Sequence, residues 1–148
     1  MCDFTTDISP CGSTMTAASS TIKLTSCTKN IDTYLVQHGI SSSKNWGTSS
    51  GITEYGLILN RAGKFSISSN EIERLQICQN HRRTLSTKWP GVWRQTCSFP
   101  DHQGKKNAMK NPRRVSEHLS NAFFNKKQTV LPIGSGETYT YLKRNFIK

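Results

Sequence analysis

Residues 77–102 carry the sequence ICQNHRRTLSTKWPGVWRQTCSFPDH, whose cysteines and histidines indicate how this chain is held together. Two residues separate Cys78 from His81, four separate Cys97 from His102, and fifteen lie between the two pairs. This pattern resembles the paired-ligand spacing of small structural zinc sites, although it is not the usual finger spacing. Two thiolates and two imidazoles would complete a tetrahedral shell and leave no position for a substrate water. We therefore predict one structural zinc site formed by these four residues.

The alternative is that Cys78 is an ordinary buried cysteine, that Cys97 is incidental, and that both histidines face solvent. Two Cys/His pairs within 25 residues favour the metal site in a chain that has only four histidines. Composition favours it too, because only 34% of the residues are hydrophobic and the mean hydropathy is −0.57. Apolar burial alone would give a marginal core, and metal binding would supply the missing folding free energy.

The first ligand pair is predicted to lie on a helix. Ser68 precedes Glu71 by three residues, the spacing of a reciprocal helix cap, and apolar residues follow at near-helical intervals. We expect a helix over residues 70–85, which would place Cys78 and His81 on one face.

Two further elements complete the predicted fold. The β-prone runs 57–59 and 65–67 flank residues 60–64, which contain the Asn and Gly that suit a hairpin loop. A second helix is expected over residues 112–125, with one apolar stripe. The predicted fold class is a small, zinc-stabilised α+β module with a β-hairpin and two helices.

The N-terminal third has a different composition. Residues 1–51 are rich in Ser and Thr and show no sustained apolar period, so we expect a disordered arm before a basic zinc-binding module at residues 52–148. Within the arm, residues 31–40 could form a short helix or strand closed by Gly39. The sequence assigns no role to Cys2, Cys11 and Cys27.

Charge is concentrated in the second half of the chain. The net charge is +11, from 20 Lys and Arg against 9 Asp and Glu, and residues 71–148 account for +10 of it. Such a surplus attracts polyanions, either nucleic acid or an acidic membrane surface. We predict nucleic-acid binding, to duplex DNA first, through basic side chains that the zinc would gather; the same basic run could also serve as a nuclear-import signal. These residues are Arg82, Arg83, Lys105, Lys106, Lys110, Arg113 and Arg114.

A protein-interaction adaptor is the rival hypothesis. A zinc-stabilised module could dock a partner through exposed aromatic anchors, with binding that salt barely affects. For the tryptophans, packing in the small core is the favoured interpretation. The candidate anchors are Trp89, Trp93, Phe99, Phe123 and Phe124.

Two resemblances bear on these predictions. Residues 97–102 resemble the Cys-x-x-Pro-x-His turn of Smad MH1 domains and of His-Cys box homing endonucleases, which bind DNA. More widely, the cap at Ser68, the ligand pairs and the Pro-Ile-Gly-Ser-Gly run at 132–136 resemble an uncharacterised zinc-binding module of animal open reading frames. That resemblance implies a shared fold and metal site and no activity. The module has a cysteine pair after its glycine turn, whereas residues 138–141 contain none.

We expect no enzymatic activity. The endonucleases use a histidine base and an asparagine-bound metal, and His118, Asn107 and Asn111 are available, but nothing in the sequence brings them together. We also expect no secretion and no membrane span, because residues 1–20 lack a signal-peptide pattern and no long apolar window occurs. A nuclear or cytoplasmic location follows, where clustered thiols bind metal.

Overall fold

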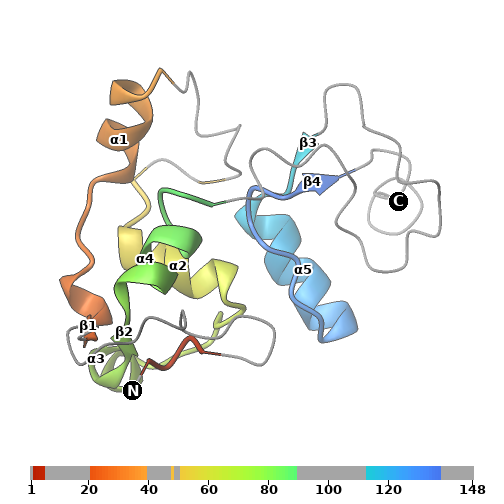
Figure 1. The fold of residues 1–148 in the computed structure, drawn as a ribbon. Coiled ribbons are helices and arrows are strands. Elements are labelled where there is room, and N and C mark those ends of the chain that lie inside the picture. Colours follow the sequence, from red (N-terminus) through yellow and green to blue (C-terminus); the bar gives the residue numbers. More distant parts are fainter. Residues whose placement is uncertain (1, 6–20, 40–47, 49–50, 90–112, 138–148) are drawn as a thin grey trace.

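The computed structural model describes residues 2–5, 21–39, 48, 51–89 and 113–137. Within them, five α-helices and two antiparallel pairs of short strands form a small α+β fold (Figure 1). The α+β class is confirmed, with more helices than the two we predicted. None of the helices in this part of the chain combines the length and apolar character needed to cross a membrane.

The elements are short and follow one another closely. The helices are α1 (Ile31–Gln37), α2 (Glu54–Arg61), α3 (Ser69–Arg74), α4 (Gln79–Leu85) and α5 (Glu117–Lys127), with a 3-10 turn η1 (Leu24–Ser26) before α1. Strand β1 (Ile22–Lys23) pairs with β2 (Gln76–Ile77), and β3 (Arg113–Arg114) pairs with β4 (Gly136–Glu137). Helices α2 and α4 lie side by side in the centre, between α1 and α5 (Figure 1).

Residues 21–39 depart from the predicted disordered arm because they pack against the second half of the chain. Ile22 pairs with Ile77 in the β1–β2 register, and the amide of Leu24 donates to the carbonyl of Leu75 at 2.9 Å. This N-terminal segment is too polar to bury itself, but its few apolar side chains fill a core built from distant residues. The buried side chains from residues 2–5 and 21–39 are Cys2, Phe4, Leu24, Cys27, Ile31 and Leu35.

The hairpin predicted over residues 57–67 is wrong, because α2 occupies its first half. The Thr53 hydroxyl caps this helix by accepting from the amide of Gly56 at 3.1 Å. Leu57 belongs to one hydrophobic cluster and Ile58 to another, so the helix is buried on more than one side. A short apolar run has the same composition in a buried helix as in a strand.

The single helix predicted over residues 70–85 is also wrong, although its cap is confirmed. The Ser68 hydroxyl accepts from the Glu71 amide, and the Glu71 carboxylate accepts from the Ser68 amide at 3.0 Å. The helix then ends, since Leu75 is extended and strand β2 pairs with β1 before α4 begins. This long-range pairing divides the segment into α3, β2 and α4.

The predicted C-terminal helix exists, with a later start. Its N-cap is Ser116, whose hydroxyl accepts from the Leu119 amide at 3.2 Å, because the two residues before Val115 form β3. Phe123 is fully buried on the inner side of α5. The Ser120 hydroxyl donates to the Leu131 carbonyl and fixes the chain that returns from the helix.

Gly63 offers a test of how α2 meets the segment after α5. Its φ is +74°, and a Cβ built there would lie 2.2 Å from Cγ2 of Val130. Gly63→Ala should therefore cost about 2–4 kcal/mol of unfolding free energy, from the left-handed backbone and the clash together. Gly39→Ala is the matched control, because its φ is +66° with nothing within 4 Å, and should cost about 1 kcal/mol. Urea titrations measure both, and equal losses would contradict the Gly63–Val130 contact.

Candidate metal centre

Cys78 and His81 meet at the start of α4. Cys78 is the N-cap of the helix, and its Sγ accepts from the His81 amide at 3.5 Å. Its Sγ also lies 3.3 Å from Nδ1 of His81. The predicted pair is thus brought together, by the geometry of a helix cap rather than by a shared helix face.

Cys2 is the third member of this cluster. Its Sγ lies 3.4 Å from Nδ1 of His81 and accepts from the Cys78 amide at 3.3 Å. Asp3 holds this segment beside β2, because its amide donates to the Gln76 carbonyl and its carboxylate accepts from the Gln76 amide. The ligand atoms of Cys2, Cys78 and His81 all lie within 4.8 Å of one another.

This geometry suits a small tetrahedral metal ion. Zinc bonds of about 2.3 Å to sulfur and about 2.0–2.1 Å to nitrogen place the two ligand atoms about 3.5 Å apart. The observed separations are 3.3 and 3.4 Å, and they also suit thiol–imidazole hydrogen bonds in the metal-free protein. Amide donors directed at both sulfurs suit metal-bound thiolates. Cys2, Cys78 and His81 could therefore hold a metal ion.

The structure supports part of the predicted zinc site, because two of its four ligands belong to a cluster that could hold a metal ion. Cys78 and His81 lie together, whereas Cys97 and His102 lie outside the described residues. Sequence reasoning missed Cys2, which has no Cys or His near it at ligand spacing. One local signal was available, since residues 2–5 alternate apolar and polar side chains with the period of a half-buried extended segment, and the structure buries the two apolar ones.

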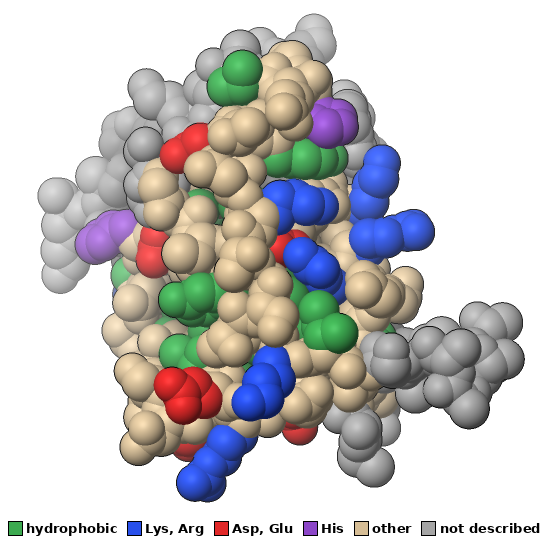
Figure 2. All heavy atoms as spheres, turned by 90° about the vertical axis from the view of Figure 1, so that its left-hand side faces the viewer, with side chains coloured by type: hydrophobic (Ala, Val, Ile, Leu, Met, Phe, Trp, Pro, Cys, Tyr) green, Lys and Arg blue, Asp and Glu red, His purple; other side chains and the backbone are tan. Residues whose placement is uncertain are grey.

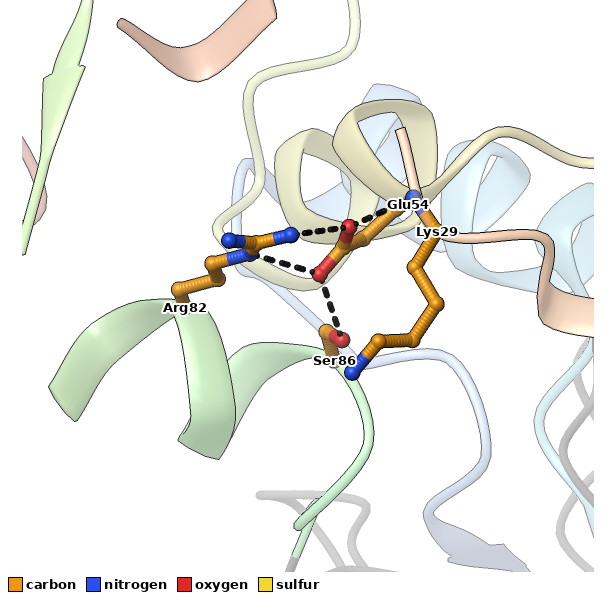
Figure 3. A network of polar contacts seen from close by, with 4 residues as sticks. All are labelled: Lys29, Glu54, Arg82 and Ser86. Atoms are coloured by element: carbon orange, nitrogen blue, oxygen red, sulfur yellow. Dashed lines mark hydrogen bonds and ion pairs between the residues drawn. The ribbon is translucent and has the colours of Figure 1, made fainter. Parts of the chain in front are cut away.

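Glu54 anchors α2 to α4 through Arg82, the residue that follows the candidate ligand His81 (Figure 3). Its side chain is only 1% exposed, and both carboxylate oxygens accept hydrogen bonds of 2.9 Å from the guanidinium of Arg82. The Lys29 amide donates at 2.9 Å and the Ser86 hydroxyl at 3.2 Å. Burial works to raise the pKa of Glu54, but these hydrogen bonds outweigh it and hold the pKa below its usual value.

The same ion pair changes the expected role of Arg82. Its hydrogen bonds to Glu54 raise the pKa of the guanidinium, and its side chain is 25% exposed. Arg82 was predicted to contact phosphates, whereas the structure pairs its charge with that of the buried Glu54. Its neighbour Arg83 is exposed on α4.

Arg61 joins three parts of the fold. Its Nε donates to the Ile133 carbonyl at 3.2 Å, and its Nη1 donates to the carbonyls of Leu85 and Ser86 at 2.8 Å. The guanidinium lies 4.9 Å from the centre of the Trp89 ring, so Trp89 contributes to the interior. Burial lowers the pKa of Arg61 to about 9, which keeps the group charged at neutral pH.

Of the other five residues predicted to contact DNA, the structure describes two. Arg113 and Arg114 form β3, and partial burial lowers the pKa of Arg114. The other three, Lys105, Lys106 and Lys110, lie outside the described residues.

The aromatic anchors of the adaptor hypothesis are partly internal. Phe123 is 0% exposed, and Phe124 is half-buried with its ring 5.2 Å from that of Phe65. Trp93 and Phe99 fall outside the described residues. The expectation of an exposed anchor is therefore wrong for Phe123.

Comparisons of the chain with protein-family models, with curated proteins and with solved structures find no match. The resemblances described above therefore stay predictions, and the functional argument rests on the residues themselves.

Proposed function

We propose that this chain is a zinc-stabilised module that binds nucleic acid in a regulatory rather than a catalytic role. The zinc part is supported by the donor set of Cys2, Cys78 and His81, because two thiolates and an imidazole suit Zn²⁺ better than Mg²⁺ or Ca²⁺. All three ligands are at most 4% exposed, which suits a structural ion rather than one that must meet a substrate. A fourth ligand would come from Cys97 or His102.

The nucleic-acid part is supported by charge. Residues 71–148 carry a net charge of +10, and the described residues alone hold 12 Lys and Arg against 7 Asp and Glu. Two of these twelve, Arg61 and Arg82, are used inside the fold and add little to the charge available to a partner. A net positive surplus of this kind suits a phosphate backbone as the partner.

Salt dependence tests this proposal. Binding of the full chain, reduced and zinc-loaded, to a short fluorescein-labelled DNA duplex should weaken by at least about 100-fold between about 50 and 200 mM salt. Arg113→Gln with Arg114→Gln should lower the slope of log K against log salt by about 1.8, since each lost phosphate contact removes about 0.9. Fluorescence anisotropy measures both. No binding, or binding that salt leaves unchanged, would contradict the proposal.

A further inference from the structure

A continuous basic surface connects α1 with the end of α4. We call it the α1–α4 face, and it consists of Lys29, Tyr34, His38, Arg83 and Lys88. The Lys29 ammonium lies 5.7 Å from the centre of the Tyr34 ring, and the His38 ring stacks on Tyr34 with centroids 4.0 Å apart. Three of these five residues, Lys29, Tyr34 and His38, come from the N-terminal segment, which the charge analysis left out.

A side-chain hydrogen bond from Tyr34 ties its two halves together. The Tyr34 hydroxyl donates to the carbonyl of Thr87 at 3.3 Å, which joins α1 to the turn after α4. In that turn, the Lys88 amide donates to the Arg83 carbonyl at 2.8 Å. These contacts fix the backbone positions from which Lys29, Arg83 and Lys88 extend.

Among the residues that the structure describes, the acid nearest this face already has a cationic partner. Glu54 is the acid beneath it, and its carboxylate is already paired with Arg82 and bonded to the amide of Lys29. The acid on α1, Asp32, accepts from the Gly51 amide at 2.9 Å. In Figure 2, Lys and Arg side chains gather below a histidine on the side of the molecule that carries α1. Lys29, Arg83 and Lys88 are all exposed.

We infer that the α1–α4 face is a phosphate-contacting surface for nucleic acid, with Lys29, Arg83 and Lys88 meeting the backbone. This inference rests on the proposed function and adds the part of the molecule that makes contact. The metal centre supports the surface, because Cys78 and His81 fix the start of α4, and the Glu54–Arg82 pair fixes its middle. On α1, the Tyr34 ring, which stacks on His38, lies under the ammonium group of Lys29.

The test compares two triple variants of equal charge. The first changes Lys29, Arg83 and Lys88 to Gln, and the control changes Lys23, Lys126 and Lys127, which are exposed elsewhere. The first should lower the salt slope by about 2–3 and weaken duplex binding at least about ten-fold at 0.1 M salt. The control should retain most of the slope, since it removes the same net charge but not these contacts. Circular dichroism spectra of both variants, compared with wild type, are the control for folding.

The outcomes separate this inference from the proposed function. If the wild-type chain binds DNA with a steep salt slope and both triple variants behave alike, the α1–α4 face is overturned while nucleic-acid binding stands. If the wild-type chain does not bind DNA, both fail. Vesicles containing phosphatidylserine provide a second arm. Loss of vesicle binding in the first variant, with DNA affinity unchanged, would assign the face to a membrane and overturn the inference.

Discussion

Treatment of the reduced chain with a strong zinc chelator is expected to abolish its cooperative thermal unfolding. The cluster of Cys2, Cys78 and His81 joins the N-terminal segment to the start of α4, so loss of an ion bound there would separate segments that share one core. Structural zinc contributes about 10–16 kcal/mol in finger peptides, whereas whole domains are stable by about 5–15 kcal/mol. Circular dichroism melts before chelation, after it and after zinc is restored measure the effect.

A cysteine outside the cluster provides the control. Cys27 is buried in the same hydrophobic core, and burial raises the pKa of its thiol, so it stays protonated. Cys27→Ser should lower the melting temperature but leave unfolding zinc-dependent, while Cys78→Ser should remove the zinc dependence together with the transition. A chain that melts identically with and without zinc would contradict the metal-centred account of the fold.

Replacing Glu54 should have the second-largest effect. Glu54→Ala leaves Arg82 without its counter-charge and removes the acceptor of the Lys29 amide and the Ser86 hydroxyl. Removing one partner of a buried ion pair costs about 3–5 kcal/mol. Urea titration of the zinc-loaded chain measures the loss, and Glu73→Ala on the exposed side of α3 should leave the midpoint nearly unchanged. A small effect of Glu54→Ala would show that α4 is held without this pair.

The same residue predicts a dependence on pH. The folded pKa of Glu54 lies below its ordinary value of 4.5, so the stability it contributes is complete above that pH and is lost as the pH falls through the lower folded value. Glu54→Gln should therefore remove part of the acid sensitivity below about pH 4.5. The difference between the pH curves of the variant and of wild type is the quantity to compare, because it isolates the contribution of this carboxyl group.

Local signals in the sequence predicted the features that local chemistry determines. The Ser68–Glu71 cap is present as expected, because a reciprocal cap needs only neighbouring residues. The apolar stripe around Phe123 predicted α5, and the spacing of Cys78 and His81 brought those side chains together. Each of these features depends on residues within one or two helical turns.

The wrong secondary-structure predictions concern segments whose conformation depends on contacts with distant residues. Strand β2 forms because Ile77 pairs with Ile22, which lies more than fifty positions earlier in the chain. The helical pattern of residues 70–85 does not indicate that pairing. Residues 57–59 are buried on more than one side of α2, so they form a continuous apolar run whose pattern does not separate a helix from a strand.

The missing ligand has the same cause. Cys2 lies 76 positions before Cys78, and only the pairing of its segment with Gln76 brings the two thiols together. Composition alone assigned residues 1–51 to a disordered arm, because it counts a few apolar side chains and not where they pack. The charge analysis overlooked Lys29 for the same reason.

Zinc stoichiometry and affinity of Cys2→Ser, against wild type, test the central claim most directly. Native mass spectrometry gives the number of ions, and competition with a chromophoric chelator gives the affinity. We predict one zinc per wild-type chain and, because ligand loss weakens binding, at least about a ten-fold loss of affinity in Cys2→Ser. A wild-type chain without zinc, or a Cys2→Ser chain that binds one zinc as tightly as wild type, would contradict the account.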